Sequence, residues 1–108
     1  NFRGIGASAG QHGYGVGEVD DCLAVIEWAL KQEGVSRLWL MGFSFGGFVA
    51  AAAASRLARW PERVVLVAPS VVKQDFAALK PLAGPVCVMM GEDDDVVAPA
   101  AVYAALCI

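Results

Sequence analysis

The sequence has little charge, and positive charge is the scarcer kind. Only 18% of the 108 residues are charged, with 8 lysines and arginines against 11 aspartates and glutamates, so the net charge is −3. Proteins that bind nucleic acid carry a basic patch, and the sequence shows no cluster of lysines and arginines. We therefore expect no nucleic-acid partner. The opening residues Asn1-Phe2-Arg3-Gly4 contain no apolar core, so we expect no secretory signal peptide.

Cysteine and histidine are also scarce. The three cysteines, Cys22, Cys87 and Cys107, are odd in number, far apart and set among apolar residues. This pattern predicts buried free thiols in a reducing compartment rather than a disulfide or metal framework. We accordingly expect a cytoplasmic protein with no metal ion and no organic cofactor. The single histidine, His12, lies near the start of the sequence.

Apolar residues, in contrast, make up 57% of the sequence. Such a high share predicts either a sheet covered on both faces or a piece of a larger protein. One uncharged stretch, residues 38–54, has 17 residues and reaches the lower limit for a membrane-spanning helix. Three glycines and a serine lie at its centre, and a strand, a turn and a helix account for them better than a lipid-exposed helix does. We expect no membrane segment.

Apolar runs and helical periodicity alternate along the chain. A glycine-rich loop over 3–17 precedes a helix over 18–33, and Gly34 is suited to close that helix. Buried strands alternating with helices predict a doubly wound, mostly parallel sheet of the α/β class with helices on both faces. The expected elements are strands over 37–41, 63–68 and 85–90, helices from the turn after 41 to about 59 and from Pro99 onward, and a linker over 71–82 with a helical turn or two near 75–79.

The most informative motif is Gly42-Phe43-Ser44-Phe45-Gly46-Gly47, between a buried strand and a helix of small residues. A serine hydroxyl is a weak nucleophile and must be held exposed on a strained turn, next to a base. Gly42 and Gly46 remove side chains that would collide across such a turn, and the N–H of Phe45 could donate to an oxyanion. Ser44 is therefore a candidate nucleophile in a nucleophile elbow. The alternative is a small polar residue in a glycine-rich turn.

A second motif, Gly91 to Pro99, follows the strand predicted over 85–90 and contains Asp93, Asp94 and Asp95. Loops after parallel strands share the edge of the sheet where the serine lies. A carboxylate there could orient a histidine and stabilise its imidazolium. The alternative is that these aspartates form a solvated acidic turn before the next helix. Three adjacent aspartates cannot all be catalytic, so at least two of them belong to such a turn.

Three segments resemble the α/β-hydrolase superfamily, and in particular its small lidless bacterial serine hydrolases. They are the elbow Gly42-Phe43-Ser44-Phe45-Gly46-Gly47, the acid loop Gly91-Glu92-Asp93-Asp94-Asp95-Val96-Val97 and the first loop Asn1-Phe2-Arg3-Gly4-Ile5-Gly6-Ala7-Ser8-Ala9-Gly10. The resemblance implies a catalytic triad in which Asp94 is the acid, with Asp93 or Asp95 less favoured. Ala98 departs from it, since proline is usual there.

The resemblance also implies parts that the sequence lacks. The superfamily orders its triad as serine, acid and histidine, whereas His12 precedes Ser44. We therefore expect the catalytic base beyond Ile108. The alternatives for His12 are a position near the substrate or, against the chain order, the role of the base itself. The third strand and its oxyanion N–H are expected before Asn1, which would leave the strand over 37–41 with an open edge. Residues 1–108 are thus expected to form a partial α/β-hydrolase domain, truncated at both ends.

The connection between Val67 and Val86 is short, which leaves no room for a cap domain over the site. This favours an open site and a small-molecule acyl substrate. The preferred esters are expected to be small or flexible enough to reach the site. Phe43 and Phe45 either line its acyl side or pack in the core. We expect a serine hydrolase that cleaves an ester or related acyl bond through an acyl-enzyme. The alternatives are a non-catalytic binding or scaffold protein of the same fold, and an acyltransferase or peptidase.

Overall fold

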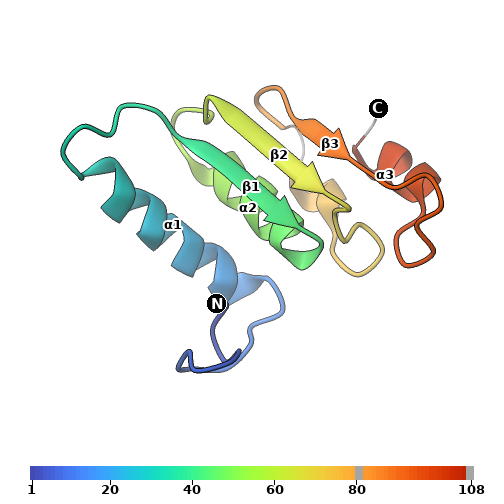
Figure 1. The fold of residues 1–108 in the computed structure, drawn as a ribbon, viewed down its shortest axis with the longest axis horizontal. Helices are drawn as coiled ribbons and strands as arrows, with labels where there is room; N and C mark the ends of the chain where they lie inside the picture. The colour runs from blue at the N-terminus through green and yellow to red at the C-terminus, as the bar shows by residue number, and fades with distance from the viewer. Residues whose placement is uncertain (80–81, 107–108) are drawn as a thin grey trace.

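The computed structural model describes residues 1–79 and 82–106. Within them the chain forms one parallel sheet with strand order β1-β2-β3 (Figure 1). The elements in chain order are α1 (Val16–Leu30), β1 (Trp39–Phe43), α2 (Phe45–Arg56), β2 (Arg63–Val67), the 3₁₀ helix η1 (Phe76–Leu79), β3 (Cys87–Met89) and α3 (Pro99–Leu106). The α/β class and the parallel sheet predicted from the sequence are confirmed.

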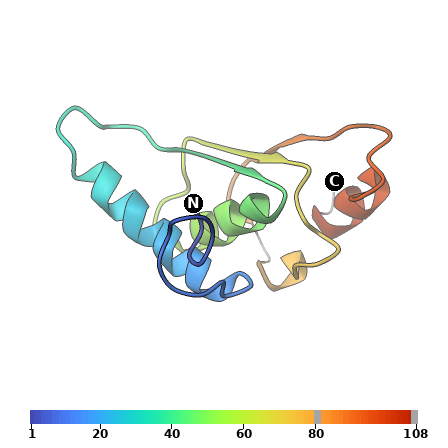
Figure 2. The same ribbon diagram turned by 60° about the horizontal axis from the view of Figure 1, so that its bottom comes forward.

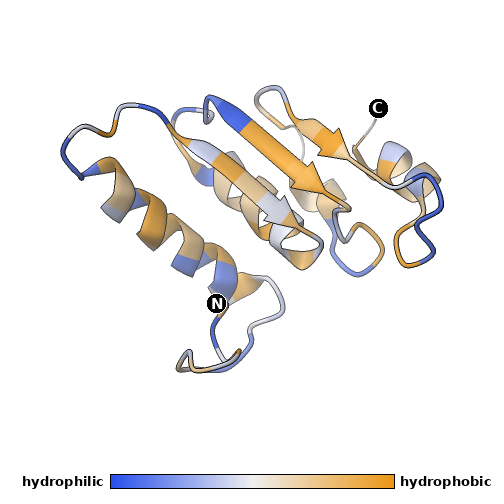
Figure 3. Cartoon of the chain, viewed as in Figure 1, coloured by the Kyte–Doolittle hydropathy of each residue, from blue (hydrophilic) through white to orange (hydrophobic). Residues whose placement is uncertain are grey.

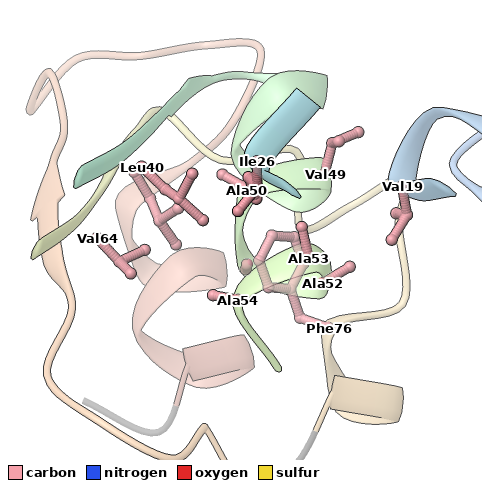
Figure 4. Close-up of a cluster of buried hydrophobic side chains, with 12 residues drawn as sticks. Val19, Ile26, Leu40, Val49, Ala50, Ala52, Ala53, Ala54, Val64 and Phe76 are labelled. Atoms are coloured by element: carbon pink, nitrogen blue, oxygen red, sulfur yellow. The ribbon is translucent and has the colours of Figure 1, made fainter. Parts of the chain in front are cut away.

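The helix α2 forms the centre of the core because its residues are small enough to lie close to the sheet. All five alanines from Ala50 to Ala54 are buried, and α2 packs against α1, β1 and β2. Figure 4 shows Leu40 of β1 and Val64 of β2 with these alanines, while Ile26 of α1 and Phe76 of η1 belong to the same cluster.

The strands bury alternate residues, as expected when one face of a sheet is packed. In β1, Leu40 and Gly42 are buried, whereas Trp39, Met41 and Phe43 are 65%, 69% and 70% exposed. In the described residues the helices lie on one side of the sheet (Figure 2). The other face carries the exposed apolar side chains of Trp39, Met41, Phe43 and Met89, and most of β2 is hydrophobic in sequence (Figure 3).

This arrangement differs from the expectation of helices on both faces. The strand order β1-β2-β3 advances in one direction across the sheet. Crossovers between parallel strands are right-handed in nearly all proteins, so successive crossovers in one direction fall on the same face. Coverage of the second face needs a reversal of direction, and the described residues contain none.

Two predictions about element lengths and cysteines need correction. α2 ends at Arg56, about three residues before the predicted end, because Leu57 adopts an extended conformation. Cys87 is exposed because it lies on the open face of β3, and Cys22 is only half-buried, so neither is a fully buried thiol. Burial nevertheless raises the pKa of Cys22. The third cysteine, Cys107, lies outside the described residues, as does the last residue of the helix predicted after Pro99.

The uncharged stretch over 38–54 is divided between β1, a turn and α2, as the sequence predicted. Within the residues that the structure describes, no helix combines the length and apolarity that crossing a membrane requires.

Candidate active site

Ser44 occupies the turn between β1 and α2, with φ 54° and ψ −117°. Residues with a side chain rarely adopt positive φ, and such strain gathers at functional sites. Ser44 precedes the first residue of α2, Phe45, so the turn that carries the hydroxyl is also the N-terminus of a helix. N–H groups in the first turn of a helix have no partner within that helix. Ser44 therefore lies on the strained strand-to-helix turn that the sequence predicted.

The elbow is so tight that Gly42 admits no side chain and Gly47 leaves little space for one. A Cβ atom on Gly42 would collide with the backbone carbonyl of Gly46, and one on Gly47 would lie 3.2 Å from the Cα of Pro69. A Cβ atom on Gly46 would meet only the ring of Phe2, at an ordinary 3.5 Å. The steric requirement is thus strict at Gly42 and weaker at Gly47, whereas Gly46, which was also expected to avoid a collision, has room for a Cβ atom.

Hydrogen bonds from the end of β2 fix the elbow. The N–H of Ser44 donates to the carbonyl oxygen of Val67 at 2.9 Å, and the N–H of Ser70 donates to the carbonyl oxygen of Ser44 at 3.1 Å. Ala68, which lies between Val67 and Ser70, also has a positive φ, of 44°. The strained serine is therefore held from the neighbouring strand as well as from its own.

The acidic loop after β3 treats its three aspartates differently. One carboxylate oxygen of Asp94, Oδ1, accepts hydrogen bonds from the N–H groups of Val96 and Val97, both at 2.9 Å. Asp94 is half-buried, while Asp93 and Asp95 are exposed. The backbone of the loop therefore orients the carboxylate of Asp94, the aspartate selected by the family resemblance. The same bonds also stabilise the turn that leads to α3.

Ser44 and Asp94 follow strands whose carboxyl ends meet at one edge of the sheet (Figure 1). Ser44 comes directly after β1 and Asp94 five residues after β3, with β2 between them. Two interstrand spacings amount to about 10 Å, which leaves room for a third side chain between the serine and the acid.

His12 lies beside the elbow. Its ring centroid is 5.0 Å from that of Phe45, the residue after the nucleophile. Its Nδ1 accepts a hydrogen bond from the N–H of Tyr14 at 3.2 Å and lies 3.5 Å from a carboxylate oxygen of Glu18. The Phe45 ring packs between His12 and Phe2, whereas Phe43 is exposed on the open face.

Glu18 was not among the functional residues expected from the sequence, although its side chain lies at the centre of the loop before α1. The side chain is fully buried and accepts hydrogen bonds from the N–H groups of Gly13 at 2.7 Å and Gly15 at 3.2 Å. Gly15 is the N-cap of α1, and a glutamate three residues after an N-cap commonly reaches back to its N–H. The spacing of Gly15 and Glu18 was therefore the sequence signal from which this contact could have been predicted.

Burial raises the pKa of Glu18, but the N–H groups of Gly13, Glu18 itself and Gly15, together with His12, outweigh it and lower the pKa below the ordinary value. Hydrogen-bond donors that favour the charged form explain this direction. Glu18 is therefore a buried anion at neutral pH.

An open groove of about 580 Å³ runs beside the elbow, between α1 and the edge strand β1. Its walls are mostly apolar and include Phe2, Val25, Met41 and Phe43. Within the described part of the chain, no three side chains of the kinds that bind metal ions lie together as a metal site.

Comparison with known proteins gives consistent results. The family described as serine aminopeptidase, S33 matches residues 1–84. An uncharacterized protein of Rickettsia prowazekii is 32% identical over 100 residues, which cover 90% of this chain and 42% of that protein.

Solved structures of similar fold include an alpha-beta serine hydrolase homologue from Coxiella burnetii, with a TM-score of 0.88, 38% identity, and coverage of 98% of this chain and 50% of that one. A serine hydrolase without lid from Xanthomonas campestris has a TM-score of 0.83 and 40% identity over 96% of this chain and 46% of that one. The chain thus spans about half the length of these proteins or less.

Proposed function

The chain belongs to the serine aminopeptidase S33 family of α/β serine hydrolases, and we propose that it supplies the nucleophile and the acid of an enzyme that cleaves an ester or related acyl bond. The observation that carries this proposal is the backbone of Ser44, a residue with a side chain held at φ 54° on a strand-to-helix turn. Such strain persists only where the surrounding structure imposes it.

In the proposed reaction the Oγ of Ser44 attacks the carbonyl carbon of the acyl group, and a histidine takes the hydroxyl proton. The N–H of Phe45 donates to the oxyanion, and one such donor is worth about 10²–10³ in rate. The tetrahedral intermediate then collapses, the C–O bond to the alcohol breaks, and the histidine returns the proton to the leaving oxygen. Water releases the acyl group from Ser44 by the same steps.

The proposal assigns Asp94 as the acid that orients this histidine and stabilises its imidazolium. The orientation of its carboxylate by Val96 and Val97 supports Asp94 over Asp93 and Asp95. The base itself is proposed to follow Ile108 in the full-length protein. His12 is the single histidine of this sequence, and its Nδ1 already accepts a hydrogen bond from the N–H of Tyr14.

The substrate is proposed to be a small or flexibly accessible acyl compound. The described part of the connection between β2 and β3 contains only the short helix η1, which is too small to act as a lid. The similar protein from Xanthomonas campestris is likewise described as lacking a lid.

Hydrolysis of a peptide bond is a second candidate, because the matched family is described as serine aminopeptidase. Both reactions pass through an acyl group on Ser44 and differ in the leaving group. Parallel assays with an aryl ester and an aminoacyl arylamide would separate them. Turnover of the ester alone would favour the esterase, and turnover of both would favour the peptidase.

Labelling with a fluorophosphonate tests the nucleophile. The full-length protein is expected to take up one label, and Ser44→Ala to take up none. Ser36→Ala is the matched control, because Ser36 is exposed in the loop between α1 and β1, at the other end of the strand. Equal labelling of Ser44→Ala and the unsubstituted protein would refute the proposal, and a folded protein without any label would favour a non-catalytic role.

A further inference from the structure

The buried carboxylate of Glu18 has no part in the reaction proposed above, although it lies close to the elbow. Charged groups are rarely buried unless they are paired and hydrogen-bonded. Glu18 meets this condition through the N–H groups of Gly13 and Gly15, and its third neighbour is the Nδ1 of His12 at 3.5 Å. The loop over 10–15 therefore folds over this carboxylate, and the N–H of Tyr14 orients the imidazole through Nδ1 at 3.2 Å.

The imidazole in turn contacts the elbow. The ring of Phe45 contacts two aromatic rings, with its centroid 5.0 Å from that of His12 at an interplanar angle of 42° and 5.0 Å from that of Phe2 at 76°. Aromatic pairs at such separations attract one another by about 0.5–1.5 kcal/mol beyond the burial of their area. The contacts with His12 and Phe2 thus restrict the Phe45 side chain.

The Phe45 side chain and the proposed oxyanion donor share one residue. Phe45 is the first residue of α2, so its Cα joins the restricted ring to the N–H that faces the reacting oxygen in the proposed mechanism. Such donors act only when they are fixed before the reaction, and a displacement of about 1 Å in a catalytic group can cost about 100-fold in rate.

We propose that His12, placed by the loop that Glu18 stabilises, is a positioning residue that fixes Phe45 and its oxyanion-binding N–H next to Ser44. This inference rests on the proposed serine hydrolase function. It assigns His12 no proton transfer, and it accounts for a histidine that lies beside the nucleophile but before it in the chain.

The role of His12 can be separated from the folding of the loop. The hydrogen bonds that hold the loop run from Gly13 and Gly15 to Glu18 and do not involve the imidazole. Loss of the imidazole deprives the N–H of Tyr14 of its acceptor, but Tyr14 is 80% exposed, so water can replace it. His12→Ala therefore removes the contact with Phe45 and leaves the hydrogen bonds of Glu18 intact.

Fluorophosphonate inactivation of the full-length protein, resolved into a maximal rate and a binding constant, gives the kinetic test. In His12→Ala we expect the maximal rate to fall about tenfold, less than the 10²–10³ for loss of the whole donor, with the binding constant within about twofold. His12→Phe should restore most of the rate, because a phenyl ring keeps the contact with Phe45. Gln11→Ala, an exposed neighbour in the same loop, is the matched control. An unchanged maximal rate in His12→Ala would overturn the proposal.

A second measurement does not depend on activity. Residual dipolar couplings give the direction of the Phe45 N–H relative to the other N–H groups of α2. We expect this direction to change in His12→Ala and to be retained in His12→Phe and Gln11→Ala. If the unsubstituted protein takes up no label, the proposed function is refuted. The dipolar couplings then test separately whether His12 positions the Phe45 N–H. A Phe45 N–H that keeps its direction in His12→Ala would then overturn the positioning role.

Discussion

Replacing Glu18 with alanine would remove the acceptor around which the loop over 10–15 is built. The carboxylate accepts two backbone N–H groups, from Gly13 at 2.7 Å and Gly15 at 3.2 Å, and no part of its side chain is exposed. Hydrogen bonds to a charged group contribute about 1.5–3 kcal/mol each, and a buried N–H left without an acceptor costs about 1–3 kcal/mol. We therefore expect Glu18→Ala to lower the free energy of unfolding by about 3–5 kcal/mol.

Glutamine at position 18 separates charge from shape. Glu18→Gln keeps one oxygen acceptor, but its amide N–H₂ would face a backbone N–H that now lacks a partner. The neutral amide is also less costly to bury than a carboxylate, which offsets part of the loss. The expected decrease in stability is about 1–3 kcal/mol.

The effect of this substitution should depend on pH. The pKa of Glu18 in the folded protein lies below its ordinary value of 4.5. A carboxyl group with a depressed pKa stabilises the fold fully above the pKa of the unfolded state, and this stabilisation is lost as the pH falls through the folded pKa. The difference in stability between the unsubstituted protein and Glu18→Gln should thus be constant from neutral pH down to about pH 5 and shrink below 4.5.

Urea unfolding of the full-length protein, followed by circular dichroism at pH 7 and pH 4, measures these differences. Given a urea dependence of about 1–3 kcal/mol per molar, the midpoint of Glu18→Ala should fall by at least about 1 M. Asp20→Asn is the matched control, because Asp20 pairs with Arg56 at 2.9 Å on the surface, where ion pairs contribute about 0–1 kcal/mol. A loss below about 1 kcal/mol in Glu18→Ala would refute the assignment of Glu18 as the anchor of the loop.

Two further predictions concern the site itself. Gly42→Ala should destabilise the full-length protein by about 3 kcal/mol or more in urea unfolding. Its Cβ would collide with the carbonyl of Gly46, which is part of the backbone and cannot move as a side chain can. An unchanged midpoint would contradict this prediction. Asp94→Asn should lower kcat in an aryl ester assay by up to about 10⁴, as loss of a triad acid does. The exposed neighbour Asp95→Asn should retain its kcat, and equal losses in both variants would argue against Asp94 as the acid.

The elbow was predictable because everything that defines it is local. A buried strand, a serine between glycines and a run of alanines are contiguous in the sequence, and they form β1, the turn and α2. The reason for the glycines was less accessible, since the contact of Gly47 with Pro69 depends on how β2 ends. Local patterns predict a turn but not which distant backbone crosses it.

Glu18 and the open face of the sheet were missed for a different reason. An acid in the first turn of a helix is normally solvated, and only the folding of residues 10–15 over Glu18 makes it buried. The face on which a helix packs follows from the order of the strands, which no single segment encodes. The packed face of the sheet depends on contacts between segments far apart in the sequence, whereas the burial of Glu18 depends on how the loop just before it folds.

The placement of backbone strain bears on whether this fold is catalytic or serves only as a scaffold. Among the described residues, positive φ at residues other than glycine occurs at Tyr14, Ser44 and Ala68. Tyr14 donates to His12 beside the elbow, and Ala68 adjoins Val67, whose carbonyl oxygen accepts the N–H of Ser44. Each such residue costs of order 1–3 kcal/mol and is retained only where its surroundings impose it. A scaffold has no need to hold a serine in this conformation, whereas a nucleophile does, so strain gathered around Ser44 favours the catalytic interpretation.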